Sequence, residues 1–229
     1  MVDNEKHRTN LCQALVTGGF NLGKGSDQVL ALGFDTVTKN AVEGYICNVL
    51  RELPALPDRR FMHQSVIVKG KTGSWTLFVV GGKSDARSWH NTVWSLDLLP
   101  YFKSGVMRTN EDGTTERVTS KWQTCAPMEF CRSSFAMIGL RNYIYVYGGI
   151  SGADTGDRSH YPQLASAAVE CYTIANDSWE TKTINTAPKL AAFSWCQMGD
   201  TTQIVVVGGT NGDIMSDETC VVDLQDGTV

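Results

Sequence analysis

Four short apolar runs, each ending in two glycines, constrain this chain more than any other feature. The runs are Ala14–Gly19, Leu77–Gly82, Tyr143–Gly149 and Ile204–Gly209. The first glycines of successive pairs are 63, 67 and 60 residues apart, and such a recurring unit indicates a repeat architecture. Glycine accepts positive φ and allows close approach of backbones, so the pairs are predicted to be structural. They are Gly18 and Gly19, Gly81 and Gly82, Gly148 and Gly149, and Gly208 and Gly209.

Around each glycine pair the pattern predicts short strands joined by turns. About three, four, four and three strands are expected in units that span residues 11–57, 58–127, 128–188 and 189–229. No stretch has the period of a long amphipathic helix. One four-stranded sheet cannot bury both faces alone, so neighbouring units must stack. Radial stacking of such sheets makes a β-propeller, and we predict an all-β protein of this type with one domain, 1–229.

Beyond the glycines, the sequence resembles the kelch-repeat β-propellers. In that family the double glycine is followed by an apolar strand closing on Asp, then by a Trp and a Pro-containing run that leads to an Arg. The matching residues are Asp35, Asp97, Asp223, Trp122, Trp179, the run 57–60 ending in Arg60 and the run 127–132 ending in Arg132. The pattern departs in three places: Thr173 replaces an Asp, the first unit has no Trp, and Lys189-Leu190 replace an Arg.

The resemblance implies a ring larger than this chain. Kelch propellers usually have six blades, sometimes five or seven, and each blade has four strands. Only about four blades, partly incomplete, fit into 229 residues, so the chain is expected to be a fragment of a five- to seven-bladed ring. Unpaired sheet edges invite pairing with another chain, which makes self-association feasible. The Trp side chains are expected to fill the gaps between adjacent blades.

The composition argues against several classes of function. Asp and Glu number 24 against 20 Lys and Arg, so nothing favours nucleic acid or a membrane surface as a partner. No apolar run approaches the roughly 18 residues of a membrane-spanning helix. The polar residues 1–8 do not resemble a signal peptide. Seven cysteines, an odd number without C-x-x-C spacing, indicate a reduced chain and a cytoplasmic location.

Loops that follow the glycine pairs should share one face with the loops that lead into the next unit, because strands alternate in direction. This face is predicted to bind a partner through Arg60, Arg87, Trp89, His90, Arg132, Arg158, His160 and Tyr161. Arg binds carboxylates in a bidentate manner, and Trp, Tyr and Arg are frequent interface anchors. We therefore predict a non-catalytic protein-interaction module with a protein or peptide ligand of acidic character. The alternative is that these arginines pair with neighbouring acids and hold loops.

Two further functions stay open through the resemblance. Some kelch-type propellers are sugar mutarotases or copper oxidases, and Arg60, His63 and Arg132 would supply part of a sugar-isomerase site. Others recruit substrates to ubiquitin ligases, with the help of domains that this sequence does not contain. No cofactor or metal is predicted, because His and Cys lack metal-site spacing. The run Gly18–Lys24 is close to a phosphate-binding loop, but Gly25 replaces the required Ser or Thr and no helix is expected after it.

Overall fold

The fold of the described part of the chain is all-β, as the sequence predicts. The computed structural model describes residues 14–21, 24–39, 42–70, 73–102, 107–109, 113–117, 119–151, 163–164, 168–183, 188–226 and 228–229. Within these ranges the single helix, α1 (Leu99–Phe102), has four residues. No helix in the same ranges is long and apolar enough to cross a membrane.

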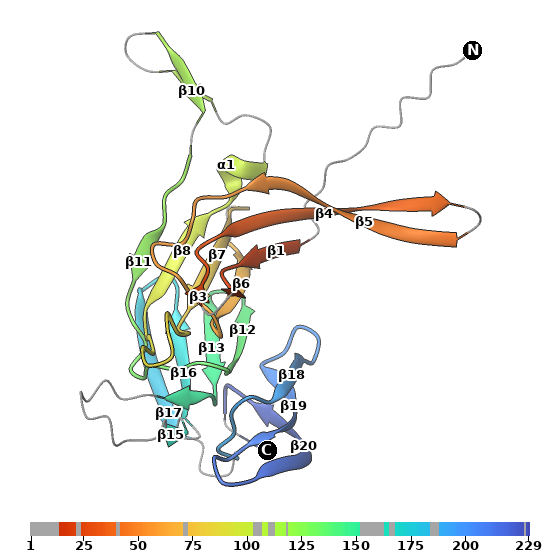
Figure 1. Ribbon diagram of the computed structural model, residues 1–229. Helices are drawn as coiled ribbons and strands as arrows, with labels where there is room; N and C mark the ends of the chain where they lie inside the picture. The colour runs from red at the N-terminus through yellow and green to blue at the C-terminus, as the bar shows by residue number, and fades with distance from the viewer. Residues whose placement is uncertain are drawn as a thin grey trace.

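Four antiparallel sheets make up most of this part of the molecule (Figure 1). Sheet 1 has the order β1 (Ala14–Thr17), β4 (Val29–Lys39), β5 (Val42–Glu52). Sheet 2 has the order β6 (Gln64–Lys69), β7 (Trp75–Val80), β8 (Val93–Asp97), β11 (Gln123–Cys125). Sheet 3 has the order β12 (Ala136–Leu140), β13 (Tyr143–Tyr147), β16 (Ala168–Thr173), β17 (Ser178–Thr183). Sheet 4 has the order β18 (Ser194–Gln197), β19 (Gln203–Thr210), β20 (Met215–Asp223).

Counted over the described strands, these sheets have the three, four, four and three strands that the sequence predicts. Three two-stranded pairs lie outside them: β2 (Phe20–Asn21) with β3 (Lys24–Gly25), β9 (Met107–Thr109) with β10 (Thr115–Arg117), and β14 (Ile150–Ser151) with β15 (Gln163–Leu164). Figure 1 places β10 and β15 at opposite ends of the molecule, and the far half of the β4–β5 hairpin extends away from the other sheets.

The apolar run of β7 is continuous because this strand is covered on both faces. Leu77, Phe78, Val79 and Val80 are consecutive, and none is more than 2% exposed. Leu77 and Val79 pack in a cluster with Val29 of sheet 1, whereas Phe78 and Val80 pack in a cluster shared with sheet 3. A half-buried strand would alternate apolar and polar residues, so the unbroken run indicates a sheet enclosed between two others.

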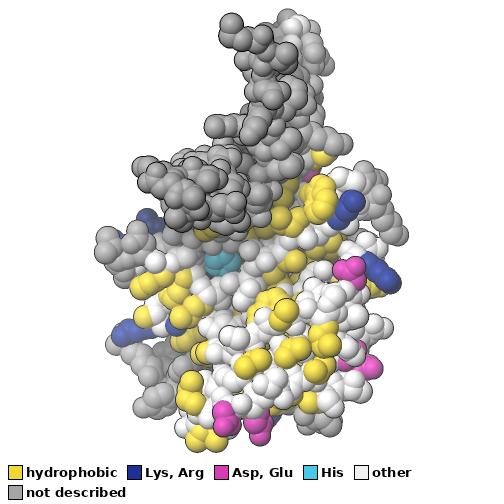
Figure 2. Space-filling view, turned by 90° about the vertical axis from the view of Figure 1, so that its right-hand side faces the viewer, with side chains coloured by type: hydrophobic (Ala, Val, Ile, Leu, Met, Phe, Trp, Pro, Cys, Tyr) yellow, Lys and Arg dark blue, Asp and Glu magenta, His cyan; other side chains and the backbone are white. Residues whose placement is uncertain are grey.

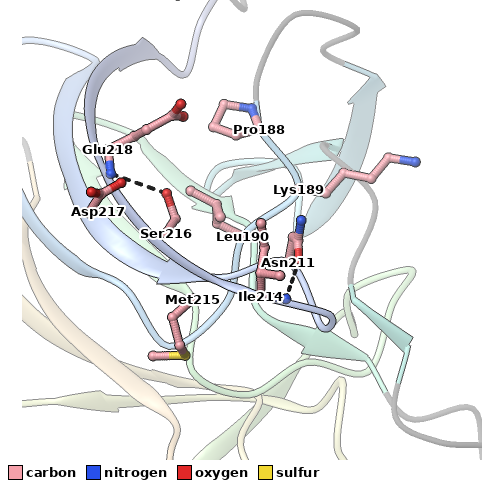
Figure 3. A pocket seen from close by; sticks show the side chains of 9 residues that line it. All are labelled: Pro188, Lys189, Leu190, Asn211, Ile214, Met215, Ser216, Asp217 and Glu218. Atoms are coloured by element: carbon pink, nitrogen blue, oxygen red, sulfur yellow. Dashed lines mark hydrogen bonds between the residues drawn. The ribbon is translucent and has the colours of Figure 1, made fainter.

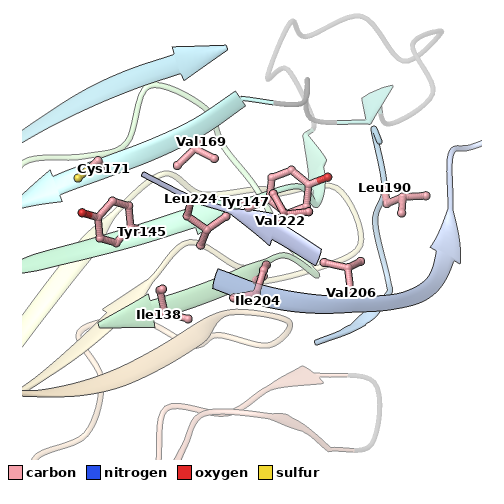
Figure 4. Packing of buried hydrophobic residues seen from close by; sticks show 11 residues of the cluster. Ile138, Tyr145, Tyr147, Val169, Cys171, Leu190, Ile204, Val206, Val222 and Leu224 are labelled. Carbon is pink, nitrogen blue, oxygen red and sulfur yellow. The ribbon is translucent and has the colours of Figure 1, made fainter. Parts of the chain in front are cut away.

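A third apolar cluster joins sheets 3 and 4 in the same way (Figure 4). Ile138, Tyr145 and Tyr147 from sheet 3 pack against Ile204 and Val222 from sheet 4. The three clusters therefore stack the four sheets one upon the next, in chain order. Burial of apolar area between the sheets is the main favourable contribution to folding, at about 25 cal/mol per Å².

The glycine pairs form the joints between successive units. A Cβ atom on the first glycine of the first three pairs would lie 2.5, 2.7 and 2.7 Å from the carbonyl oxygens of Arg60, Arg132 and Leu190. The amide of the second glycine donates a hydrogen bond to the same carbonyl, at 2.8, 2.8 and 2.9 Å. The first glycines also have positive φ, from 57° to 70°. Only glycine combines that conformation with so close an approach.

Two tryptophans each connect a sheet to the chain segment that precedes it. The indole Nε1 of Trp122 donates to the carbonyl of Pro54 at 2.9 Å, and that of Trp179 donates to the carbonyl of Ala126 at 2.8 Å. In each case the acceptor belongs to the segment that leads into the unit carrying the tryptophan. Both side chains also pack against the apolar clusters between sheets, which confirms their expected position.

Replacing Trp179 with Phe is expected to lower the free energy of unfolding by about 1–2 kcal/mol, because it removes the donor to a partly buried carbonyl while keeping an aromatic ring. The measurement is urea denaturation followed by circular dichroism. Trp75, which is 45% exposed, supplies the control, and Trp75→Phe should change stability by less than about 0.5 kcal/mol. Equal effects of the two substitutions would contradict the structural role of Trp179.

Candidate functional site

Two of the eight residues that the sequence predicts to bind a partner are buried in the structure. Arg60 and Arg132 are only 2% and 0% exposed. A partner docking on this face cannot reach either guanidinium group, so both arginines act within the fold. This burial favours the alternative in which the arginines hold loops, and it gives no support to a sugar site built around them. Arg158, His160 and Tyr161 lie outside the described residues.

Arg132 forms a buried ion pair with Glu170 of β16. Its Nη2 lies 2.5 Å from Oε2 of Glu170, and its Nη1 donates to the carbonyl of Gly148 at 3.0 Å. The other carboxylate oxygen of Glu170 accepts from the amide of Glu129 at 2.5 Å and that of Phe130 at 3.4 Å. Burial raises the pKa of Glu170, and the charge of Arg132 with the two amides opposes that rise. The pair therefore ties the segment entering sheet 3 to the middle of that sheet.

Arg60 occupies the corresponding position in the preceding unit but has different partners. Its Nη1 donates to Asp58 at 2.8 Å and to the carbonyl of Arg59 at 2.9 Å, and its Nη2 donates to Thr92 at 3.0 Å. The guanidinium carbon lies 4.4 Å from the centre of the Trp94 ring, which is a cation–π contact. The result is the same as for Arg132: the entering segment is fixed to the third strand of its sheet.

Arg87, Trp89 and His90, the other described members of the predicted set, lie on one loop after Gly82. The carboxylate of Asp85 organises this loop, because it accepts from the amide of Arg87 at 2.7 Å and from the amide and hydroxyl of Ser88 at 2.9 and 2.8 Å. These bonds lower the pKa of Asp85. The acid is thus occupied within the loop, while the Arg87 side chain is exposed.

Lys83 and Trp89 close the base of the same loop. The ammonium nitrogen of Lys83 lies 3.9 Å from the centre of the Trp89 ring and donates to the carbonyl of Ala86 at 3.0 Å. His90 contacts Ser84 through Nε2 at 2.9 Å. Burial lowers the pKa of Lys83, and the charge of Asp85 opposes this. The loop therefore presents a fixed, partly desolvated cation.

Beside Lys83 lies a pocket of about 480 Å³. Its lining comes from three segments of the chain: Gly19, Phe20, Phe61, Met62, Lys83 and Ala86. The Phe20 and Phe61 rings are 4.9 Å apart, and Phe20 and Met62 are 61% and 54% exposed. Among the described residues no three His, Cys, Asp or Glu side chains are grouped as metal ligands. An apolar pocket with one cation at its rim is suited to binding.

Sequence reasoning missed Phe20, Phe61, Met62 and Lys83. One signal was present, since Phe20 follows a glycine pair directly and so places a large apolar side chain in a predicted loop. Nothing in the sequence marked Met62, which has a φ of 54° just before sheet 2 begins. These four residues come from three separate segments, and they lie close together only because sheets 1 and 2 stack.

His63 lies next to Met62, at the joint between sheets 1 and 2. Its Nε2 is 2.8 Å from the hydroxyl of Thr17, and its Cε1 would be 2.7 Å from a Cβ on Gly18. Phe135 and Phe193 hold the same position at the next two joints. Burial, followed by the charge of Arg60, lowers the pKa of His63 from 6.5 to about 4.

This shift predicts a loss of stability in mild acid. Between pH 6.5 and pH 4 the unfolded chain binds a proton at His63 that the folded chain does not, so stability present above pH 6.5 is lost as the pH falls. From pH 7.5 to pH 5 the loss from this residue should be about 2 kcal/mol. The check is urea denaturation at both pH values, on the parent and on His63→Phe, whose ring matches the other joints. An unchanged pH dependence in the variant would contradict the assignment.

The geometry defines an all-β protein built from repeated antiparallel sheets, with an apolar pocket on the loops of one face. No protein-family model and no curated protein matches the chain. The fold is similar to a solved structure titled "Structure of YjhT", with a TM-score of 0.56 and 11% sequence identity. The match covers 91% of this chain and 62% of the other, so the chain spans less than two thirds of that protein. At this identity the likeness concerns the fold alone.

Proposed function

We propose that the four sheets are neighbouring blades of a kelch-type β-propeller that acts as a non-catalytic protein-interaction module. The equivalent glycine joints, the chain-order stacking of the sheets and the two tryptophan contacts support the propeller part of this proposal. Its partner is a protein or peptide that docks on the loops after the glycine pairs. The rigid stack of sheets holds these loops in place, as scaffolds with binding loops commonly do.

The observation that carries the binding function is the exposed apolar pocket at the loops. Phe20 and Met62 are more than half exposed although both are large and apolar, and Phe61 and Lys83 complete a concave lining. An exposed apolar surface with a polar rim is typical of a protein-interaction or ligand-binding site. Burying an aromatic or aliphatic side chain of a partner here would contribute about 1.5–3 kcal/mol.

The charges at the rim favour an acidic partner segment. Asp85 and Asp58 are already engaged by the loop amides and by Arg60. The cations Lys83 and Arg87 lie on the same loop, and the ammonium of Lys83 is partly desolvated. A carboxylate next to the apolar anchor would pair with this ammonium, and such charge-assisted hydrogen bonds are the stronger ones. We therefore assign the pocket to a peptide segment that combines an apolar anchor with Asp or Glu.

Selection from a random peptide library displayed on phage tests this function. We expect peptides enriched in an aromatic or aliphatic residue next to Asp or Glu. Binding of the selected peptides should weaken by at least about tenfold in the double variant Phe20→Ser with Met62→Ser, because the apolar lining is lost. The matched control is Ile214→Ser with Met215→Ser, two residues 66% and 78% exposed at the start of β20. Peptides that bind both double variants equally well would contradict the assignment.

A further inference from the structure

Beside the loop pocket, three segments of the chain are joined through isolated β-bridges. Ser26 pairs with Arg60, whose amide donates to the carbonyl of Ser26 at 3.0 Å. Phe61 pairs with Lys83, whose carbonyl accepts from the amide of Phe61 at 2.9 Å. These segments, together with the loop that follows Gly82, form what we call the loop platform. It consists of residues 24–27, 58–61 and 83–90.

The three segments approach one another closely at Gly25. A Cβ atom on Gly25 would lie 3.3 Å from Cβ of Arg59 and 3.3 Å from the carbonyl oxygen of Ser84. The amide of Ser84 donates to the carbonyl of Ser88 at 3.3 Å, so the loop that carries Arg87 folds back onto Ser84. The backbone of the platform therefore anchors Arg59 and Arg87 on neighbouring segments.

The two arginines of the platform that reach solvent have guanidinium groups without partners among the described residues. Arg59 and Arg87 are exposed, and their hydrogen bonds to described residues involve backbone atoms alone. A guanidinium group has several N–H donors in a planar fork that fits carboxylate and phosphate oxygens. Lys24, which is also exposed, and Lys83 add two ammonium groups to the same platform. The platform therefore offers more cationic donors than one carboxylate can accept.

Two of the three acids of the platform already have partners. The carboxylate of Asp58 accepts from the amide of Arg59 and from Nη1 of Arg60, both at 2.8 Å. Both oxygens of Asp85 accept from donors of its own loop. The platform has five Lys and Arg against three Asp, whereas the whole chain has 20 Lys and Arg against 24 Asp and Glu. The charge balance is therefore reversed at the platform, which attracts anions.

Another pocket, in sheet 4, has the opposite character. Its volume is about 540 Å³, and its lining includes Asp217, Glu218 and Lys189 together with apolar side chains such as Met215 (Figure 3). On the side of the molecule shown in Figure 2, Lys and Arg side chains lie at the margins, and Asp and Glu side chains gather at the lower end. Two acids beside one lysine repel an anion, so the loop platform is the better site for one.

The excess of donors at the platform favours a phosphate group over a carboxylate. A phosphorylated side chain carries a charge of about −1.5 to −2 at neutral pH and has three acceptor oxygens. Arginine clusters are a common means of recognising phosphorylated and acidic motifs. A phosphate between Arg59 and Arg87 would accept a forked pair of hydrogen bonds from one guanidinium and further bonds from the other. A single carboxylate would leave part of these donors without a ligand.

We propose that the partner segment carries a phosphoserine or phosphothreonine beside its apolar anchor, and that Arg59, Arg87 and Lys83 bind the phosphate. The anchor occupies the loop pocket, so this inference rests on the proposed function and narrows its acidic partner to a phosphorylated one. A protein partner is favoured over a membrane because the platform adjoins a concave apolar pocket and the chain as a whole is acidic. Phosphorylation of the partner then switches binding on.

Peptide arrays test the phosphate directly. One array has a fixed phosphoserine flanked by degenerate positions, and its twins have glutamate or serine in that place. We expect the chain to bind phosphoserine peptides that carry an aromatic or aliphatic residue nearby. In fluorescence anisotropy the best of these should bind at least about tenfold more tightly than its glutamate twin, because the phosphate accepts more charge-assisted hydrogen bonds.

Substitution of the two arginines tests their role. The double variant Arg59→Gln with Arg87→Gln should bring the phosphoserine and glutamate peptides to within about twofold of each other in affinity. The matched control is Arg141→Gln with Lys121→Gln, which removes two exposed cations elsewhere and should keep the preference for phosphate. Circular dichroism checks that both variants fold like the parent. A preference that survives the loss of both arginines, or equal binding of the two peptides to the parent, would overturn the proposal.

The pocket variant Phe20→Ser with Met62→Ser separates this inference from the proposed function. Peptides that lose binding in that variant but are indifferent to phosphorylation would leave the loop pocket as the partner site and refute the phosphate site alone. Phosphoserine peptides that need Arg59 and Arg87 but not Phe20 and Met62 would support the phosphate site and refute the apolar pocket. Sedimentation with vesicles of phosphatidic acid adds a last arm. Binding to these vesicles but to no phosphoserine peptide would assign the cations to a membrane surface and overturn the proposal.

Discussion

Replacing Glu170 with alanine is expected to lower the free energy of unfolding by about 3–5 kcal/mol, because it breaks a buried ion pair. The substitution leaves the guanidinium of Arg132 without its counter-charge in a site that is 0% exposed. It also leaves the amide of Glu129 without the carboxylate oxygen that it contacts at 2.5 Å. An uncompensated buried charge costs more than the pair itself contributes. Urea denaturation followed by circular dichroism measures the effect.

Two controls separate buried charge from charge pairing in general. Asp58→Ala breaks the ion pair of Arg60, but Asp58 is 54% exposed and Arg60 keeps the carbonyl of Arg59 and the ring of Trp94. Water can solvate what remains, so this substitution should cost less than about 1 kcal/mol. The double variant Arg132→Met with Glu170→Leu removes both buried charges and should recover most of the loss. Similar effects of Glu170→Ala and Asp58→Ala would show that the burial of Glu170 is not important for stability.

The repeat in the sequence predicts the positions of Arg60 and Arg132 but not the partners of their side chains. Arg60 and Arg132 were found from the run that leads into each unit, and they do occupy equivalent positions. Their burial could not be foreseen, because Glu170 belongs to the apolar strand Ala168–Thr173 and meets Arg132 only through the register of the sheet. At the same register position Arg60 meets Trp94. One repeat position therefore accommodates two chemically different partners.

The strands themselves were easier to predict than their ends. The expected numbers of strands, about three, four, four and three, agree with the described strands of sheets 1–4. Thr173 was correctly matched to Asp97, since they face Tyr143 and Thr76 at equivalent positions. Asp35, however, does not hold the corresponding place in sheet 1. Thr17 faces Val29 there just as Val80 faces Val93 in sheet 2, so Gly33 is the equivalent residue.

The reason for the misplaced Asp35 is the length of the hairpin. β4 and β5 have eleven residues each and pair far beyond the point where the other third strands end. A sequence pattern that scores apolar residues cannot detect this extension, because the strand continues through Thr36, Thr38 and Lys39. β4 pairs with β5 as far as Lys39, which faces Val42. The loop pocket was missed for a related reason, since its lining residues meet only after sheets 1 and 2 stack.

The other large effect is expected at the joint between sheets 3 and 4, where Gly148→Ala should destabilise the fold by about 3–5 kcal/mol. A Cβ at this position would lie 2.7 Å from the carbonyl oxygen of Leu190 and 2.8 Å from the ring of Phe193. The φ of 70° adds a conformational penalty of about 1–2 kcal/mol for alanine. Relief requires sheet 4 to move away from sheet 3, and this movement opens the apolar cluster between them.

Substitutions at Gly199 and Gly208 separate the conformational cost of positive φ from the cost of the steric clash. Gly199 has a φ of 57° and open space around its Cβ position, so Gly199→Ala should show the conformational cost alone, about 1–2 kcal/mol. Gly208 holds the same place in its pair as Gly148, with a φ of 64°, but its one close neighbour is the carbonyl of Ser216, at 3.2 Å. Gly208→Ala should therefore fall between the other two. The order Gly148, Gly208, Gly199 in urea denaturation would establish the contact between units as the reason for the glycine pair. An equal loss of stability at all three positions would show that the glycine pair is needed only for its positive φ and not for the contact between units.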